Sequence, residues 1–221
     1  MNPERARFNM VEQQIRTWEV LDQRVLDLLY VVRREEFVPA AYRALAFSDL
    51  EIPITEGAGA GERMMPPRLE ARILQELSPQ PGAKVLEIGT GSGYLTALLA
   101  ASAARVCSVE INPRIAEIGA ANLARAGVGN VVLEIGNGIL GAARQAPYDL
   151  IVLTGSVPEA PEDLLGQLMP GGKLFAVVGS SPVMTARIYT QAGSGSHTVV
   201  DLFETDLAPL SQVATPARFR F

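Results

Sequence analysis

The stretch that decides the fold is Lys84-Val85-Leu86-Glu87-Ile88-Gly89-Thr90-Gly91-Ser92-Gly93-Tyr94. It predicts a short, buried, apolar strand that breaks into a glycine-rich turn, after which a helix follows at once in 95–100. Three glycines at alternate positions allow a tight turn and let a ligand approach the backbone closely. The N-terminus of the helix presents free N–H groups and the positive end of its dipole. We therefore expect a ligand site where this strand ends.

The spacing of the glycines distinguishes between two classes of nucleoside ligand. A dinucleotide fingerprint needs G-x-G-x-x-G. Here the third glycine, Gly93, comes one residue early, and Tyr94 takes the last position of the fingerprint. Glu87 stands two residues before the first glycine, and the pattern E-x-G-x-G-x-G resembles the first motif of the class I S-adenosylmethionine (AdoMet) methyltransferases. This spacing disfavours a nicotinamide-dependent reductase.

A second acidic residue supports a nucleoside ligand. The predicted strand at 105–110 ends in Glu110. A carboxylate about 20 residues past such a glycine turn can accept hydrogen bonds from both ribose hydroxyls. An ordinary α/β turn without a ligand would require the turn, the strand and both acids to coincide.

Composition narrows the class of protein further. A chain of 221 residues with 48% hydrophobic residues is long enough for one sizeable domain with its own core. The net charge is −5, Lys84 and Lys173 are the only lysines, and the arginines are scattered. This charge balance argues against a phosphate-backbone partner. We expect neither a nucleic-acid partner nor a membrane partner.

The counts of cysteine and histidine limit the possible metal sites, and the distribution of apolar residues bears on localisation. The single cysteine, Cys107, and the single histidine, His197, exclude a zinc site built from Cys and His ligands, so no metal cofactor is expected. Residues 1–7 lack the apolar core of a signal peptide, and no apolar run approaches the ~20 residues that span a membrane. We therefore expect a cytoplasmic protein.

The remaining pattern predicts an α/β fold. Helices are expected within 3–45 and from Pro66-Pro67 onward, with a glycine-rich loop from Thr55 to Gly61. Further along, strands are predicted near 84–88, 105–110, 130–135, 148–153 and 172–178, and helices near 93–103, 113–126 and 161–169. The segments 185–191 and 198–205 flank a Gly/Ser turn and predict a hairpin.

These elements favour a Rossmann-like, mostly parallel seven-stranded sheet with a C-terminal antiparallel hairpin and a helical N-terminal extension. We divide the chain into 1–80, the extension with its substrate loop packed on the core, and 81–221, the AdoMet-binding core. The two parts are expected to form one compact unit.

Nearly the whole chain resembles the protein-L-isoaspartate O-methyltransferase family. The motifs that carry this likeness are Arg34-Glu35-Glu36-Phe37-Val38-Pro39, Ile52-Pro53-Ile54, Val85 to Tyr94, Pro147-Tyr148-Asp149 and Gly171-Gly172. The resemblance implies an AdoMet-dependent protein carboxyl methyltransferase that acts on L-isoaspartyl residues in protein repair. Its substrates would be proteins or peptides, and S-adenosyl-L-homocysteine would be its cofactor product.

Three segments depart from the family pattern. The usual substrate loop Gly-Gln-Thr-Ile-Ser-Gln-Pro is replaced by Gly61-Glu62-Arg63-Met64-Met65-Pro66-Pro67, so Arg63 and Met65 stand where the family has hydroxyls. The usual Gly-Asp-Gly is Gly136-Asn137-Gly138, and the usual Thr-Ala-Ala is Thr154-Gly155-Ser156. The first departure affects the acceptor, and the second weakens a cofactor contact.

The motif and the resemblance together give a set of candidate site residues. The predicted cofactor-binding residues are Glu87, Gly89, Thr90, Gly91, Ser92, Gly93, Tyr94, Glu110, Ile111, Asn137, Gly138 and Thr154. The substrate-loop candidates are Arg63, Met64, Met65 and Pro66, and Arg63 is a charged donor suited to a substrate carboxylate. A carboxylate acceptor is already ionised at neutral pH, so no general base and no catalytic residue is assigned.

Three functions stay open from the sequence. The chain is an active isoaspartyl methyltransferase, a methyltransferase for another acceptor, or an AdoMet-binding homologue that serves as a non-catalytic sensor or interaction module. The oligomeric state is either a monomer or a homodimer.

Overall fold

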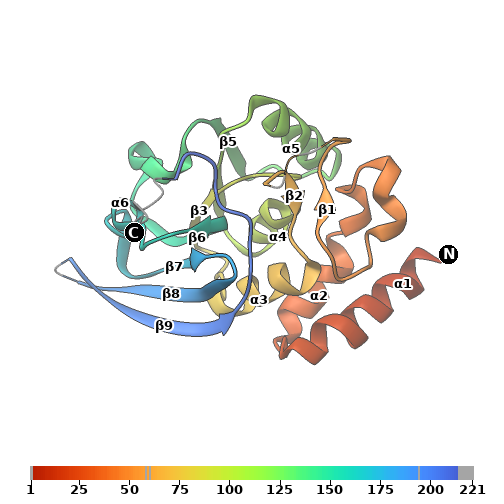
Figure 1. The fold of residues 1–221 in the computed structure, drawn as a ribbon, viewed down its shortest axis with the longest axis horizontal. Coiled ribbons are helices and arrows are strands. Elements are labelled where there is room, and N and C mark those ends of the chain that lie inside the picture. Colours follow the sequence, from red (N-terminus) through yellow and green to blue (C-terminus); the bar gives the residue numbers. More distant parts are fainter. Residues whose placement is uncertain (1, 58, 60, 194, 214–221) are drawn as a thin grey trace, which may run out of the picture.

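A twisted seven-stranded sheet runs through the centre of the molecule (Figure 1). The computed structural model describes residues 2–57, 59, 61–193 and 195–213. The strands lie in the order β5-β4-β3-β6-β7-β8-β9. Their bounds are β3 Lys84–Ile88, β4 Arg105–Glu110, β5 Val131–Ile135, β6 Tyr148–Val157, β7 Leu168–Ser180, β8 Val183–Gly193 and β9 Ser196–Glu204. Strands β5 to β7 in this order pair in parallel, and β8 and β9 are added antiparallel, as predicted.

Strand order places the ligand crevice. From β3 the chain moves to one side through β4 and β5, then returns to the other side of β3 as β6 and continues to β7. The connections that leave the carboxyl ends of the neighbouring strands β3 and β6 therefore lead in opposite directions, which opens a crevice between them. The glycine turn follows β3 directly, so it lies at this crevice.

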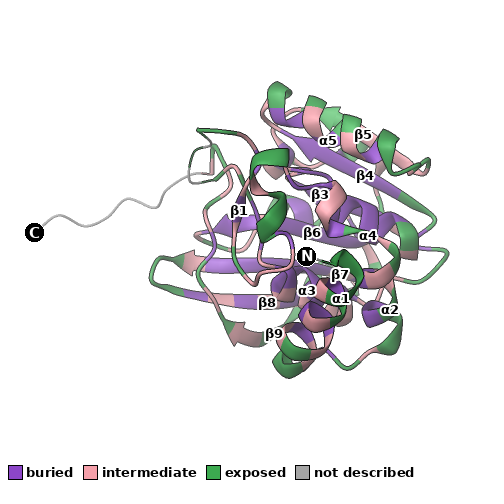
Figure 2. Ribbon diagram, turned by 90° about the vertical axis from the view of Figure 1, so that its right-hand side faces the viewer, coloured by how far each residue is buried: buried purple, intermediate pink, exposed green. Residues whose placement is uncertain are grey.

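Alternate residues along each central strand enter different packing layers. Val85 packs with the N-terminal helices, α3 (Pro67–Leu77), α4 (Tyr94–Ser102) and α5 (Pro113–Arg125). Leu86 packs on the other face with α6 (Glu162–Leu165) and the loops around it. Figure 2 shows the central strands buried between these layers. Burial on both faces explains why these strands are continuous apolar runs.

Two of the three predicted core helices are confirmed, and the third is mostly wrong. The helices expected at 93–103 and 113–126 are α4 and α5, within one residue at each end. In 161–169 the helix covers only Glu162–Leu165. From Leu168 the chain is already strand, because Leu168 pairs with Tyr148 at the start of β6. Tertiary pairing thus overrides the helical pattern beyond Leu165.

The first 45 residues are helical but irregular. They form α1 (Pro3–Asn9), the π-helix η1 (Met10–Ile15), the 3₁₀ turn η2 (Arg16–Trp18), α2 (Gln23–Val31), and two further 3₁₀ segments, η3 (Arg34–Glu36) and η4 (Ala40–Leu45). The Asp22 carboxylate accepts a hydrogen bond from Arg24 N at 2.9 Å and caps α2. No helix of the described residues is long and apolar enough to cross a bilayer.

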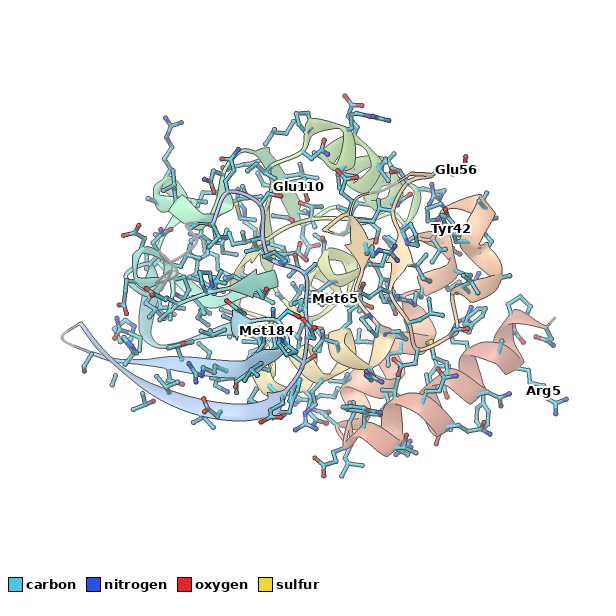
Figure 3. All side chains as sticks on the ribbon, viewed as in Figure 1. Arg5, Tyr42, Glu56, Met65, Glu110 and Met184 are labelled. Carbon is cyan, nitrogen blue, oxygen red and sulfur yellow. The ribbon has the colours of Figure 1, made fainter. Side chains whose placement is uncertain are left out.

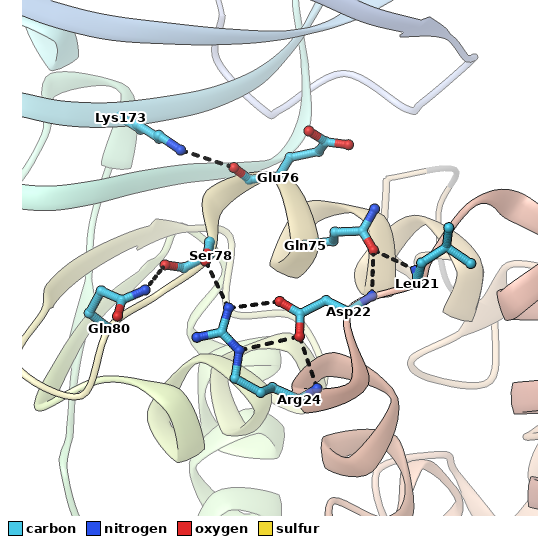
Figure 4. A network of polar contacts seen from close by, with 8 residues as sticks. All are labelled: Leu21, Asp22, Arg24, Gln75, Glu76, Ser78, Gln80 and Lys173. Atoms are coloured by element: carbon cyan, nitrogen blue, oxygen red, sulfur yellow. Dashed lines mark hydrogen bonds and ion pairs between the residues drawn. The ribbon is translucent and has the colours of Figure 1, made fainter.

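Polar contacts fasten this extension to α3 (Figure 4). The Gln75 side-chain oxygen accepts hydrogen bonds from Leu21 N at 2.7 Å and Asp22 N at 3.0 Å. Arg24 pairs with Asp22 and also donates to Ser78 Oγ at 3.3 Å. Because α3 in turn packs on the sheet, the extension is held against the core. The division of the chain at residue 80 stays a prediction.

Between the extension and α3, the chain forms a short hairpin that the sequence did not predict. Strand β1 (Ile52–Pro53) pairs antiparallel with β2 (Arg63–Met64). The loop predicted from Thr55 to Gly61 connects them, although its Ala58 and Ala60 lie outside the described residues. The hairpin therefore brings the predicted substrate loop back beside Ile52.

Candidate active site

A cleft opens at the carboxyl ends of β3, β4 and β6, where the strand order predicts it. Its walls come from the glycine turn, the loops after β4, β5 and β6, strand β2 with its flanks, and a segment after β9. In Figure 3, Glu110 is labelled above Met65 near the middle of the molecule, and both residues line this cleft. The candidates that line the cleft are Arg63, Met65, Gly89, Thr90, Gly91, Ser92, Tyr94, Glu110, Ile111, Asn137, Gly138 and Thr154.

The glycine turn has a backbone that only glycine adopts readily. Gly89 has φ +96° and Gly91 has φ +55°. A Cβ at Gly89 would overlap Thr154 Oγ1, which hydrogen-bonds the carbonyls of Ile88 at 2.9 Å and Gly89 at 2.8 Å. Thr154 therefore connects β6 to the start of the glycine turn, and it also lines the cleft.

Two of the predicted cofactor residues lie beneath the cleft surface. Gly93, with φ +85°, packs against α5, where an added Cβ would lie 3.1 Å from Gly119 O. Glu87 is fully buried and accepts hydrogen bonds from Thr96 Oγ1 at 2.5 Å and Ser108 Oγ at 2.6 Å. Burial raises the pKa of the Glu87 carboxyl to about 8. The structure thus places Glu87 as a support below the turn rather than in its wall.

Ser108 connects this buried acid to the turn. Its hydroxyl lies 2.6 Å from Thr90 Oγ1, and Thr90 lines the cleft. The chain of contacts from Glu87 through Ser108 to Thr90 fixes the turn from below.

Glu110 lies at the end of β4 and faces the glycine turn. Its Oε2 accepts a hydrogen bond from Gly91 N at 3.0 Å, and its Oε1 accepts one from Asn112 N at 3.0 Å. Each carboxylate oxygen has two lone pairs, so each keeps one acceptor site for a ligand hydroxyl. The side chain is thus fixed by two backbone donors and suited to a ribose diol. Ile111, the next residue, adds apolar wall.

One of the two hydrogen-bonding groups of the Asn137 side chain is already used by the backbone. Its side-chain oxygen accepts a hydrogen bond from Ile139 N at 3.1 Å and caps the 3₁₀ turn η5 (Gly138–Leu140). Its amide nitrogen lies 3.5 Å from Gln212 Oε1, leaving that donor weakly engaged. Gly138 packs against the Ile88 side chain, where a Cβ would lie 2.6 Å from Cγ2. The predicted contact of Asn137 with the cofactor would use this amide nitrogen.

The substrate-loop candidates divide between the cleft and the core. Arg63 is exposed and Met65 is buried, and both line the cleft. Met64 is buried in the hydrophobic core, and Pro66 precedes α3 as its N-cap residue. Glu62 fastens the segment to the cofactor side of the cleft, because its Oε1 accepts a hydrogen bond from Asn112 Nδ2 at 2.8 Å.

One wall of the cleft was missed at the sequence level. Residues 207–211 cross the carboxyl ends of the strands: Ser156 N donates to Ala208 O at 2.9 Å, and Leu210 N donates to Ser156 O at 3.0 Å. The Leu210 side chain reaches the backbone of Gly89 and Gly155. The only signal was an apolar pair, Leu207 and Leu210, in a segment that follows the predicted hairpin. Figure 1 shows this segment returning from β9 across the sheet.

The family model for protein-L-isoaspartate(D-aspartate) O-methyltransferase matches residues 5–214. The chain belongs to this family. A protein-L-isoaspartate O-methyltransferase from Methanoculleus marisnigri is 44% identical over 175 residues, which are 79% of this chain and 78% of the relative. Another from Koribacter versatilis is 36% identical over 215 residues, which are 96% of this chain and 94% of the relative.

Solved structures of the protein-L-isoaspartate O-methyltransferase family share the fold. One protein-L-isoaspartate O-methyltransferase structure superposes with a TM-score of 0.78 at 25% identity. The superposition covers 95% of this chain and 66% of the chain in that structure. A beta-aspartate methyltransferase from Plasmodium falciparum, in complex with S-adenosyl-L-homocysteine, also gives 0.78, at 20% identity over 92% of this chain and 97% of its own. The predicted fold class and the predicted family are both confirmed.

Proposed function

We propose that this chain is an AdoMet-dependent protein carboxyl methyltransferase that esterifies L-isoaspartyl residues in proteins or peptides. The observation that carries the proposal is a single cleft lined by two different kinds of group. The glycine turn and a fixed carboxylate at Glu110 suit the cofactor, and the cationic side chain of Arg63 suits a carboxylate acceptor. Family membership supplies the reaction, and we call the parts of the cleft around Glu110 and around Arg63 the cofactor end and the acceptor end.

The cofactor end fits AdoMet. The free acceptor sites of Glu110 suit the two ribose hydroxyls, and the apolar side chains of Ile111 and Ile139 suit the faces of a base. Gly89 and Gly91 have no side chains that would keep a ligand away from the backbone of the turn. When bound, AdoMet supplies an electrophilic methyl group on a sulfonium whose leaving group is a neutral thioether.

The acceptor end fits a carboxylate. Among the cleft-lining residues that the structure describes, Arg63 is the one with a cationic side chain. Its guanidinium presents donors in a geometry that matches a carboxylate. Burial raises the pKa of Glu51 nearby, while Arg63 opposes that rise. The acceptor oxygen is ionised at neutral pH, so alignment of the reactants is the main task of the protein.

Apolar walls support the same chemistry by excluding water. Ile54, Met65 and Leu207 line the cleft, and each is nearly fully buried. An acceptor oxygen that loses its hydration shell between them is a stronger nucleophile. Met65 adds such a wall where the family usually has a hydroxyl, which makes this cleft more apolar at the acceptor end.

The test uses purified protein with methyl-labelled AdoMet and two peptides that differ only in an L-isoaspartyl or an L-aspartyl residue. We expect base-labile label in the isoaspartyl peptide alone. Label in neither peptide, with AdoMet binding intact by calorimetry, would refute the proposed acceptor. Arg63 and Met65 favour a second candidate in that case, a methyltransferase for another carboxylate. A panel of carboxylate-bearing peptides then separates that candidate from a cofactor-binding protein without activity.

A further inference from the structure

A buried ion pair lies behind the acceptor end of the cleft. Arg34, from η3 of the N-terminal extension, pairs with Glu70 on α3, and their side chains are 1% and 3% exposed. A charged group removed from water in this way is costly unless it is paired and hydrogen-bonded. Glu70 itself lines the cleft. The pair is therefore part of the site's supporting structure and not a surface contact.

Arg34 makes two further contacts with segments of the site. Its Nη2 donates a hydrogen bond to Met65 O at 2.7 Å. Its guanidinium carbon lies 5.1 Å from the centroid of the Tyr94 ring, at the first residue after the glycine turn. Residues 62–66, which include Arg63 and Met65, are called the acceptor-binding segment below. The guanidinium group of Arg34 thus contacts α3, this segment and the start of α4.

The other polar contacts at the two ends of segment 62–66 do not involve the Met65 carbonyl. Strand β2 is two residues long, and its pairing with β1 is continued by one hydrogen bond, from Ile54 N to Glu62 O at 3.0 Å. Glu62 also contacts Asn112 and Gly59, and Pro66 O accepts hydrogen bonds from Leu69 N and Glu70 N in the first turn of α3. Among the described residues, Arg34 is the donor to the Met65 carbonyl. Its guanidinium is charged and buried away from water, and a hydrogen bond from such a group is strong.

We infer that Arg34 is a positioning residue that holds the acceptor-binding segment 62–66 in its productive place through the Met65 carbonyl. The inference rests on the proposed function, because it assigns the acceptor to this end of the cleft. A lysine at this position would keep the charge but not the rigid fork that reaches Glu70 and Met65 together.

The chain provides a matched control in a neighbouring pair. Arg7 of α1 pairs with Glu35 of η3, with side chains 8% and 15% exposed, and its guanidinium lies over the Phe47 ring. This pair also ties the extension together, but its hydrogen bond does not reach the acceptor segment. Loss of either pair weakens the extension, whereas loss of the Arg34 pair alone also releases Met65 O.

The experiment compares three variants with the wild type. Arg34→Met/Glu70→Leu removes both charges and leaves no unpaired buried ion, and Arg34→Lys keeps the charge beside Glu70. Arg7→Met/Glu35→Leu is the control. Thermal unfolding establishes that each variant is folded. The measurements are KM and kcat for an isoaspartyl peptide, the Kd for AdoMet, and the rate of trypsin cleavage at the Arg63–Met64 bond, identified by mass spectrometry.

We expect both Arg34 variants to raise the peptide KM by about 10-fold or more, the effect of losing a hydrogen bond from a charged donor. The kcat should change little, because the segment still orders when saturated with peptide. Trypsin cleavage after Arg63 should accelerate by a similar factor, since a released segment fits a protease better. The control variant should match the wild type in peptide KM and in cleavage at this bond.

Equal peptide KM and equal cleavage rates in the Arg34 variants and the control would overturn the inference. A fall in kcat with unchanged KM would also overturn it, because the role would then lie in the reaction and not in the placement of the segment. If the wild type fails to methylate the isoaspartyl peptide, the proposed function fails by itself. The trypsin comparison still decides whether Arg34 holds the segment.

Discussion

Glu87→Gln tests whether the buried acid below the glycine turn is neutral in the folded protein. Its two hydrogen-bond donors contact one oxygen, Oε2, while Oε1 is buried without a partner among the described residues. Burial raises the pKa of this carboxyl from 4.5 to about 8. The folded state therefore keeps a proton that the unfolded state releases across this range, and stability contributed by Glu87 is lost as pH rises from 4.5 toward 8.

The size of this effect follows from the two pKa values. One pKa unit corresponds to about 1.4 kcal/mol, so the Glu87 contribution falls by about 3 kcal/mol between pH 5 and pH 8. Glutamine cannot titrate. The unfolding free energy of Glu87→Gln minus that of the wild type should thus increase by this amount across the range. At any single pH the difference also includes the changed hydrogen bonding of the new amide, but that term does not vary with pH.

The assay is urea unfolding followed by circular dichroism at pH 5, 6, 7 and 8. Burial also raises the pKa of Glu70, to about 7; that acid is present in both proteins, so most of its own titration cancels in the difference, although its charge contributes to the raised pKa of Glu87. Glu117→Gln, on an exposed position of α5, is the control for the substitution itself. A flat difference for Glu87→Gln would refute the reasoning, because it would mean that Glu87 is ionised in the fold.

Three other changes test the cleft. Glu110→Ala should weaken AdoMet binding by about 1.5–3 kcal/mol, the range for hydrogen bonds to a charged group, and unchanged affinity in calorimetry would contradict the ribose contact. Gly89→Ala should destabilise the fold by about 2 kcal/mol or more, because the residue has φ +96° and its Cβ would overlap Thr154; a thermal midpoint equal to that of the wild type would contradict this. Arg63→Thr/Met65→Ser restores the usual hydroxyls but removes the cation and the apolar wall, so it should lower kcat/KM for an isoaspartyl peptide by on the order of 10-fold or more; a gain would show that the hydroxyls matter more than the contact of Arg63 with the acceptor carboxylate.

The sequence predicted the central strands well for a physical reason. Lys84–Ile88 and Arg105–Glu110 are short, mostly apolar runs between turn residues, and burial on both faces leaves them little freedom to shift. The glycine turn was equally clear, because its conformation depends on residues that are adjacent in the chain. The cleft position then follows from strand order.

The features that could not be predicted from the sequence depend on contacts between segments that are distant in the chain. The strand that begins at Leu168 exists because Tyr148 pairs with it, and no local pattern specifies that pairing. The role of Glu87 depends on which side of β3 it occupies: its neighbours Leu86 and Ile88 belong to one packing layer, and Glu87 faces α4 in the other. Alternation along the strand contains that information once the strand is fixed, although the motif alone suggested a ligand contact.

The wall formed by residues 207–211 has a consequence for the order in which the site is made. The ribosome produces the glycine turn on the order of ten seconds before these residues, at ordinary rates of synthesis. Until they emerge, Gly89 and Gly155 lack the Leu210 side chain that covers them, and Ser156 lacks its partners at Ala208 and Leu210. A nascent chain can therefore assemble the sheet through β6 and still present an open crevice, so we expect the cofactor to be retained only once synthesis has passed this wall.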